Sequence, residues 1–213
     1  MTKILLVRHG QSEANNLDVF AGNYDVELTE LGHKQAQSTA KYIAENYKVD
    51  KVYASDLKRA FKTAEIIAEK FGLEVVAEKN FREIFAGEWE AVKFDELAEK
   101  YPEDWNKWRN DLGNSRCTGG ESVRELGERV INALKKVAEE NEGKIIVIGT
   151  HATPIRATQC VLGEYGYDRM MEFPWVSNAS VTEVDYIDGK FTLVDVSYDK
   201  HLENLKSTLP ANV

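Results

Sequence analysis

The sequence predicts an α/β protein with a mainly parallel central sheet and helices on both faces of that sheet. Two strongly apolar segments, residues 4–7 and 145–148, are typical of strands buried on both sides. Between and after them, segments with the periodicity of amphipathic helices alternate with further short apolar segments. Because no repeat, linker or low-complexity segment interrupts this order, we expect a single domain over residues 1–213.

Four longer segments carry apolar residues on one helical face, and each contains a residue suited to begin a helix. Thr29, Ser55 and Ser122 are the expected N-caps of the first three, and the glutamate three residues after Ser122 completes a capping box. Thr153 is the expected N-cap of the fourth helix, with Pro154 at its first position. The helices are expected over residues 30–47, 56–71, 122–141 and 154–163.

The other expected elements are shorter. Asp188 and Gly189 lie between two apolar segments and predict a β-hairpin of residues 181–186 and 191–196. From about Tyr198 onward we expect a tail. Short strands are expected over residues 51–54 and 74–77, and short helices over residues 94–100 and 103–112.

Composition limits the partners and the compartment of this protein. The chain has 213 residues, 43% of them hydrophobic, and a formal net charge of -9. This acidity argues against nucleic acid or an anionic membrane as the main partner, although a locally positive pocket for an anionic substrate remains possible. Cys117 and Cys160 lie in no CxxC pair and are expected to be unpaired thiols. With no signal peptide and no apolar run of membrane-spanning length, we expect a cytoplasmic protein.

The two buried strands each lead directly into a histidine. Arg8, His9 and Gly10 follow the first strand, and His151 follows the second. In open α/β sheets, the carboxyl ends of neighbouring strands form the crevice in which ligands bind. Gly10 would let the backbone turn and a ligand approach closely. We therefore expect the two histidines to meet in one site.

Two further side chains are candidates for that site. Arg59 falls in the first turn of a predicted helix, off its apolar face, where the helix dipole disfavours a cation. Its side chain therefore either reaches solvent or serves a ligand. Glu83 lies among bulky apolar residues that would desolvate its carboxyl group and favour the protonated form, unless the loop is simply solvated. Two arginines, two histidines and one carboxylic acid suit a phosphate ester, because arginine binds phosphate oxygens, imidazole attacks phosphorus and a carboxyl group protonates the leaving oxygen.

The order of these residues resembles that of the histidine phosphatase superfamily, the phosphoglycerate mutase-like proteins. Five motifs occur in family order between residues 3 and 151, and together they are far more specific than any one of them. They are LVRHGQSEAN at 6–15, DVELTELG at 25–32, SDLKRAFKTA at 55–64, EIFAGEWE at 83–90 and Thr150-His151.

The resemblance implies a three-layer α/β/α sandwich with a mostly parallel sheet, and a small-molecule phosphate ester as substrate. It implies a metal-independent phosphomonoesterase in which His9 becomes a phosphohistidine and Glu83 protonates the leaving oxygen. Arg8, Arg59 and His151 would hold the phosphoryl oxygens. The remaining substrate contacts are expected from Asn15, Ala21, Gly22 and Ala152. No metal or other cofactor is implied, and the oligomeric state is left open.

Two positions depart from the family pattern. Ala152 follows the second histidine where the family usually has glycine, and Ala91 stands where a glycine usually follows the Trp-Glu pair. The interval from Glu83 to His151 is also too short for the insert typical of glycolytic mutases, which favours a hydrolase.

Three alternatives use many of the same residues. A cofactor-dependent phosphoglycerate mutase would protect the phosphoenzyme from water, and a non-catalytic module would bind a phosphoester without turnover. A metal hydrolase would use histidines such as His33 and His201, but arginines beside the ligands disfavour a cation. Specificity is expected in residues 16–28, 90–120 and 164–178, whose aromatic side chains either stack on a ring-bearing substrate or pack the loops. These aromatic residues are Phe20, Tyr24, Trp105, Trp108 and Trp175.

Overall fold

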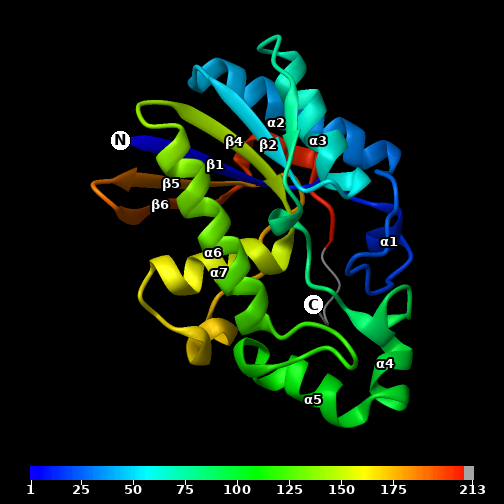
Figure 1. The fold of residues 1–213 in the computed structure, drawn as a ribbon. Helices are drawn as coiled ribbons and strands as arrows, with labels where there is room; N and C mark the ends of the chain where they lie inside the picture. Colours follow the sequence, from blue (N-terminus) through cyan, green and yellow to red (C-terminus); the bar gives the residue numbers. More distant parts are fainter. Residues whose placement is uncertain (209–213) are drawn as a thin grey trace.

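The computed structural model describes residues 1–208 of the chain. Strands and helices alternate along most of it, with the sheet between the helices (Figure 1). The strands are β1 (Thr2–Arg8), β2 (Lys51–Ala54), β3 (Val75–Ala77), β4 (Ile145–Thr150), β5 (Val181–Ile187) and β6 (Lys190–Tyr198). The α-helices are α1 (Glu13–Asn16), α2 (Glu30–Asn46), α3 (Lys58–Glu69), α4 (Phe94–Lys100), α5 (Pro102–Asn110), α6 (Val123–Glu140) and α7 (Ala152–Leu162).

The six strands form one sheet in the order β3-β2-β4-β1-β5-β6. The strands β3, β2, β4 and β1 run parallel to one another, whereas β5 and β6 are antiparallel to their neighbours. β1 and β4 lie side by side in the middle, with Lys3 opposite Ile145 at one end and Arg8 opposite Thr150 at the other. The prediction of two central, buried strands in a mainly parallel sheet is confirmed.

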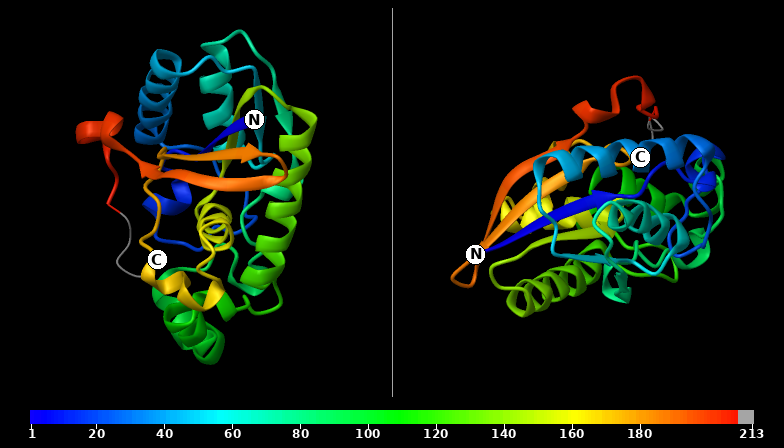
Figure 2. Two further views of the ribbon diagram at one scale, coloured as in Figure 1. Left: turned by 90° about the vertical axis from the view of Figure 1, so that its left-hand side faces the viewer. Right: turned by 90° about the horizontal axis from the view of Figure 1, so that it is seen from above.

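The side chains of β1 alternate between the two faces of the sheet and join two separate cores. Leu5 and Val7 pack with apolar residues of α2 and α3. Ile4 and Leu6 pack with apolar residues of α6 and α7 on the opposite face. Helices are visible on both sides of the sheet in the turned views (Figure 2). The predicted α/β/α sandwich is therefore confirmed.

Two of the four predicted helix starts are confirmed. The Thr29 hydroxyl accepts the N–H of Gly32 at 3.0 Å and caps α2. Ser122 caps α6, and the side chain of Glu125 accepts the Ser122 N–H at 2.9 Å, which completes the capping box. These local hydrogen bonds satisfy N–H groups that the first helical turn leaves without partners.

The predictions for the other two helix starts are wrong. Helix α3 follows Leu57, which makes no side-chain capping bond, so Ser55 is not its N-cap. Helix α7 begins at Ala152 with His151 as N-cap, two residues before the predicted start. Pro154 is then the third helical residue, where its missing N–H still costs no intrahelical bond. In both cases the residue next to the strand end, Ser55 or His151, belongs to the site.

The C-terminal part confirms the hairpin and corrects the tail. β5 and β6 pair antiparallel, with Ile187 opposite Lys190 across the turn. The chain then forms a short 3₁₀ segment, η5 (Lys200–Leu205), instead of a free tail. Gln35 of α2 donates to the Leu205 carbonyl at 2.8 Å, and Leu202 is buried. An apolar anchor of this kind is enough to dock a terminal segment.

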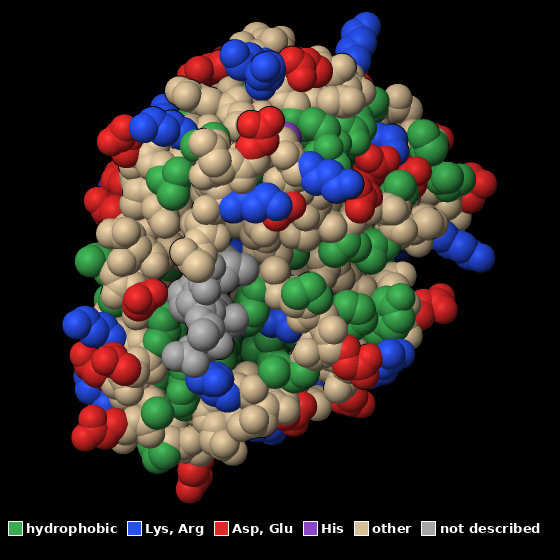
Figure 3. All heavy atoms as spheres, turned by 180° about the vertical axis from the view of Figure 1, so that it is seen from behind, with side chains coloured by type: hydrophobic (Ala, Val, Ile, Leu, Met, Phe, Trp, Pro, Cys, Tyr) green, Lys and Arg blue, Asp and Glu red, His purple; other side chains and the backbone are tan. Residues whose placement is uncertain are grey.

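The surface carries acidic and basic side chains side by side, as Figure 3 shows for one face. Some pair along a helix, such as Lys34 with Glu30, and such exposed pairs contribute little to stability. Cys117 and Cys160 are free and buried, as expected. None of the helices within residues 1–208 combines the length and apolar character needed to span a membrane.

Candidate active site

The carboxyl ends of β1 and β4 bring two histidines together. Arg8 pairs with Thr150 at the ends of the two strands, and the His9 N–H donates to the Thr150 carbonyl at 3.0 Å. The ring centroids of His9 and His151 lie 5.2 Å apart, at an interplanar angle of 63°. Both histidines are buried. The two strand ends therefore form one site, as adjacent parallel strands allow.

Arg8 and Arg59 enter this site as buried cations, with only 4% and 1% of their surface exposed. Arg8 Nη1 donates to the Val176 carbonyl, and Arg59 donates to the carbonyls of Gly22 at 2.7 Å and Tyr24 at 3.0 Å. The Nε of each arginine has no hydrogen-bond partner among the described residues. The arginine ion pairs of the described chain are all made by other arginines. The site therefore holds two buried positive charges, and no carboxylate within residues 1–208 forms an ion pair with either of them.

Of the two alternatives for Arg59, exposure to solvent is wrong. The side chain leaves the first turn of α3 and turns inward, where the Gly22 and Tyr24 carbonyls accept its hydrogen bonds. These carbonyls supply the negative partial charge that the helix N-terminus does not provide.

Burial and positive charge act together on the ionisable groups. Burial, and then the charges of Arg59 and Arg8, lowers the pKa of His9 well below its ordinary 6.5. Burial, and then the charge of Arg59, does the same to the pKa of His151. Burial lowers the pKa of Arg8 and of Arg59 to about 10. At neutral pH the site therefore combines two neutral imidazoles with two guanidinium cations.

The hydrogen bonds of the two imidazoles distinguish their nitrogens. His9 Nδ1 lies 2.7 Å from the Gly10 carbonyl and donates to it, which leaves the lone pair on Nε2. His151 Nε2 lies 2.9 Å from the Ser55 hydroxyl, and its Nδ1 has no partner among the described residues. Sequence reasoning missed this role of Ser55 because serine after a strand is also typical of a helix cap.

Gly10 has a packing role at the start of α2. A Cβ atom on Gly10 would lie 2.4 Å from the Gly32 carbonyl oxygen. The Gly10 N–H donates to the Thr63 hydroxyl of α3 at 3.1 Å. The glycine thus lets the backbone after β1 pass close to two helices and fixes the position of His9.

Asn15, an expected substrate contact, presents a donor to the pocket. Its Oδ1 accepts hydrogen bonds from the Ser12 N–H at 3.1 Å and from Asn178 Nδ2 at 3.2 Å. Asn178 also donates to the His9 carbonyl at 3.1 Å, a contact that no sequence signal indicated. With its oxygen occupied, the Asn15 side chain has its NH₂ group left for a ligand.

The Glu83 side chain is half-buried and reaches the N-terminal end of α7. Its Oε2 accepts the N–H of Thr153 at 3.3 Å, and its Oε1 accepts the N–H of Ile84 at 2.8 Å. Ala152 lies beside these groups and is also part of the pocket lining. Two backbone N–H groups thus hold the carboxyl group in place, next to the ends of the strands that the two histidines follow.

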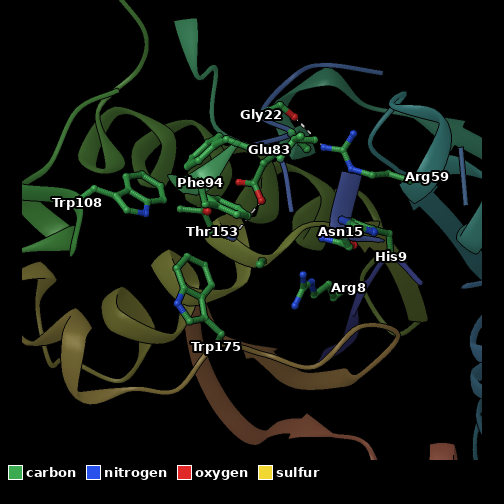
Figure 4. A pocket seen from close by; sticks show the side chains of 14 residues that line it. Arg8, His9, Asn15, Gly22, Arg59, Glu83, Phe94, Trp108, Thr153 and Trp175 are labelled. Atoms are coloured by element: carbon green, nitrogen blue, oxygen red, sulfur yellow. Dashed lines mark hydrogen bonds between the residues drawn. The ribbon is translucent and has the colours of Figure 1, made fainter. Parts of the chain in front are cut away.

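These side chains line one pocket of about 480 Å³, counting the part open to solvent. Cationic and polar residues lie on one side and aromatic residues on the other, with Glu83 between them (Figure 4). Ala21, Gly22 and Ala152 complete the lining among the expected residues, whereas His151 is fully buried beside the His9 ring. We call Arg8, His9, Asn15, Arg59 and Glu83 the polar floor. We call Val19, Phe20, Phe94, Trp108 and Trp175 the apolar wall.

The apolar wall divides the predicted specificity aromatics into two groups. Phe20, Trp108 and Trp175 line the pocket. Tyr24 is 46% exposed outside it, and Trp105 packs against the Trp89 ring inside the aromatic core. Sequence reasoning missed Val19 and Phe94 as lining residues, because an apolar residue in a loop or short helix carries no signal of what it faces.

The histidines do not gather into a metal site. His201 Nε2 lies 2.9 Å from the Thr39 hydroxyl of α2, and His33 lies on that same helix. Within residues 1–208, no group of three His, Cys, Asp or Glu side chains is arranged to hold a metal ion. The metal-hydrolase alternative therefore has no ligand set in the described chain.

Buried arginine donors beside a neutral histidine, at the carboxyl ends of central strands, have the chemistry that suits a phosphoryl group. Residues 4–199 match the model of the histidine phosphatase superfamily (branch 1), and the chain belongs to that family.

Relatives and solved structures agree with this assignment. The chain is 33% identical to phosphoserine phosphatase 1 of Hydrogenobacter thermophilus, with 95% of each chain covered. It is 34% identical to phosphoglycerate mutase-like protein 4 of Arabidopsis thaliana, over 94% of this chain and 87% of the other. The structure of YhfR from Bacillus stearothermophilus superposes with a TM-score of 0.91 at 25% identity, over 95% of this chain and 100% of that one. The family assignment makes this protein a phosphatase of the histidine phosphatase superfamily.

Proposed function

We propose that this protein is a metal-independent phosphomonoesterase that works through a phosphohistidine on His9. The observation that carries the proposal is the pair of buried arginines, Arg8 and Arg59, whose charges no carboxylate in the described chain neutralises by an ion pair. Buried cations of this kind are costly unless an anion pairs with them. A phosphate dianion bound in the pocket would pair with both guanidinium groups.

The geometry supports a role for each residue of the polar floor. His9 Nε2 attacks the phosphorus atom, the Nε2–P bond forms and the P–O bond to the leaving group breaks. The protonated carboxyl of Glu83 gives its proton to the leaving oxygen. Arg8, Arg59, Asn15 and the neighbouring His151 stabilise the charge on the phosphoryl oxygens. Glu83 then removes a proton from water, which attacks phosphorus and releases phosphate and the free imidazole.

The name of one relative supports a first substrate to try, O-phosphoserine. The name of another keeps the mutase alternative in view. Conversion of 3-phosphoglycerate to 2-phosphoglycerate faster than release of free phosphate would favour a mutase. Tight binding of phosphate esters without turnover would favour the non-catalytic module.

The experiment is phosphate release from a panel of phosphomonoesters in the presence of a chelator. We expect turnover by the wild type and a loss of at least about 1,000-fold in His9→Ala, because no other group at the site replaces the nucleophile. His33→Ala, a histidine of α2 outside the pocket, is the matched control and should keep full activity. Turnover that survives in His9→Ala would overturn the mechanism.

A further inference from the structure

The apolar wall is a rigid surface and faces the same space as the polar floor. The Phe20 ring lies edge-on to the Trp108 ring at 5.1 Å and to the Phe94 ring at 5.9 Å, measured between centroids. Behind them, the fully buried Trp89 ring contacts both Phe20 and Trp108. These rings support one another, so a ligand that contacts them orders few side chains on binding.

Trp175 is held separately from these rings. The Arg156 guanidinium lies 4.0 Å from the centroid of the Trp175 ring. Arg156 is itself buried and donates to the carbonyls of Met170 and Phe173 at 2.7 and 2.8 Å. One face of the indole is thus covered by a fixed cation, which leaves the other face for the pocket. Figure 4 shows Trp175 on the aromatic side of the pocket, away from His9 and Arg59.

The charges that line the pocket are all used by the phosphate chemistry. Among the described residues that line the pocket, those with ionisable side chains are Arg8, His9, Arg59 and Glu83. The two arginines bind the phosphate, and the other two residues act as nucleophile and proton donor in the proposed function. On the wall side of Glu83 the described lining is apolar, apart from the Thr153 hydroxyl. This side therefore offers no cation to pair with a carboxylate of the substrate and no anion to pair with an ammonium group.

We infer that the leaving group of the substrate is an uncharged, apolar alcohol large enough to lie against Trp175, Phe94 and Trp108, with a ring as the best fit. The inference rests on the proposed function, because it takes the polar floor as the phosphate site. Within the floor, Glu83 lies nearest the wall, so an ester oxygen that it protonates carries its carbon group toward the wall (Figure 4). O-phosphoserine fits this pocket poorly, because its carboxylate and ammonium would meet aromatic rings without a partner of opposite charge.

The test compares three alkyl esters whose leaving alcohols are all weakly acidic, so that differences report binding rather than leaving-group chemistry. The substrates are benzyl phosphate, ethyl phosphate and O-phospho-L-serine, each with chelator present. We expect kcat/KM to be highest for benzyl phosphate and lowest for O-phospho-L-serine. Equal or higher kcat/KM for O-phospho-L-serine than for benzyl phosphate overturns the inference.

Variants locate the preference at the wall. Trp175→Ala should lower kcat/KM for benzyl phosphate by about 10-fold to 100-fold, the value of burying one large apolar group, and change ethyl phosphate far less. Trp175→Phe should retain most of the preference, and Val194→Ala on the exposed edge of β6 is a control away from the pocket. An equal loss on both esters would assign Trp175 a structural role and contradict the inference. Should Trp175→Ala fail to fold, Phe94→Ala makes the same comparison.

Failure of this inference can be told apart from failure of the proposed function. If O-phospho-L-serine is the preferred ester and its turnover disappears in His9→Ala, the phosphatase mechanism holds and the inferred leaving group is wrong. If none of the esters is hydrolysed in a way that depends on His9, the proposed function itself fails, and the inferred leaving group fails with it.

Discussion

The polar floor and the apolar wall share one pocket but are built from different parts of the chain. Arg8 and His9 leave the end of a central strand, and Arg59 leaves the first turn of a helix packed on the sheet. The wall comes from the loop before α2, from α4 and α5, and from the segment between α7 and β5. The floor is therefore fixed by the core of the fold, whereas the wall depends on segments that carry no strand of the sheet.

This difference indicates a division of labour. In the proposed function the floor contacts the phosphoryl group, which every phosphate monoester contains, and its arginines and histidine are polar, buried and costly to assemble. The wall would contact the alcohol part, which varies between esters, and apolar surface binds by area with little demand on orientation. Changes in the floor should therefore alter the chemistry for all substrates, and changes in the wall should alter the choice among them.

The largest effect that separates floor from wall is expected for Glu83→Gln. The amide keeps the size of the side chain but has no acidic proton for the leaving oxygen. We expect kcat/KM to fall by about 100-fold to 10,000-fold for benzyl and ethyl phosphate alike. For 4-nitrophenyl phosphate, whose leaving group needs no proton, the loss should be much smaller. Phosphate release measured on the three esters checks this.

The contrast with Trp175→Ala is the control for that result. Glu83→Gln should not distinguish benzyl from ethyl phosphate, and Trp175→Ala should. A loss in Glu83→Gln that is the same for 4-nitrophenyl phosphate as for the alkyl esters would mean that Glu83 positions the phosphate instead of donating a proton.

The part of the floor at the end of β1, Arg8 and His9, was predictable from the sequence because its position follows from strand periodicity. Two apolar runs of β-branched and leucine residues indicate central strands, and whatever follows such strands lies at the same edge of the sheet. This periodicity alone places His9 and His151 in one crevice. Arg59 needed the family motif, since its place in a helix left both solvent and ligand open.

Strand periodicity did not predict the wall. It also did not predict the contact of Ser55 with His151 or the start of α7. Val19 and Phe94 are ordinary apolar residues whose direction depends on tertiary packing. Ser55 and Thr153 carry genuine capping signals, but the structure gives the Ser55 hydroxyl to His151 and begins α7 at Ala152. The capping signals gave wrong helix starts there because the side chains near these strand ends take part in the site.

A smaller effect is expected on stability. It comes from two buried histidines, His9 of the floor and His151 beside it. Their folded pKa values lie well below 6.5, so below that pH the unfolded chain binds protons that the folded chain excludes. Stability is therefore full above pH 6.5 and falls as the pH drops toward the folded pKa values. At pH 5.5 each histidine should cost on the order of 1 kcal/mol of unfolding free energy. Urea unfolding between pH 7.5 and 5.5, in phosphate-free buffer, measures this.

Comparison with a variant isolates the histidine contribution from that of the many carboxylates. In His151→Gln, the decrease in unfolding free energy between pH 7.5 and 5.5 should be smaller than in the wild type, by an amount on the order of 1 kcal/mol. Identical pH dependence in the two proteins would show that His151 is not kept neutral by burial and by Arg59.

The smallest expected effect lies in the segment that holds the wall. Ala91 has a φ of 61°, the left-handed conformation that glycine adopts without strain, and it stands where the family pattern has glycine. Its N–H donates to the Phe20 carbonyl at 2.9 Å, so this strained residue anchors one side of the wall. Ala91→Gly should stabilise the protein by about 0.5–1 kcal/mol, the relief of left-handed strain less the added freedom of the unfolded chain.

Urea unfolding at pH 7.5 measures the gain, and Ala77→Gly in β3, an exposed residue without positive φ, should lose stability instead. Unchanged kcat/KM for ethyl phosphate together with the gain would show that the wall segment can be altered without touching the floor, whereas a loss of stability in Ala91→Gly would mean that the φ of this residue carries no strain.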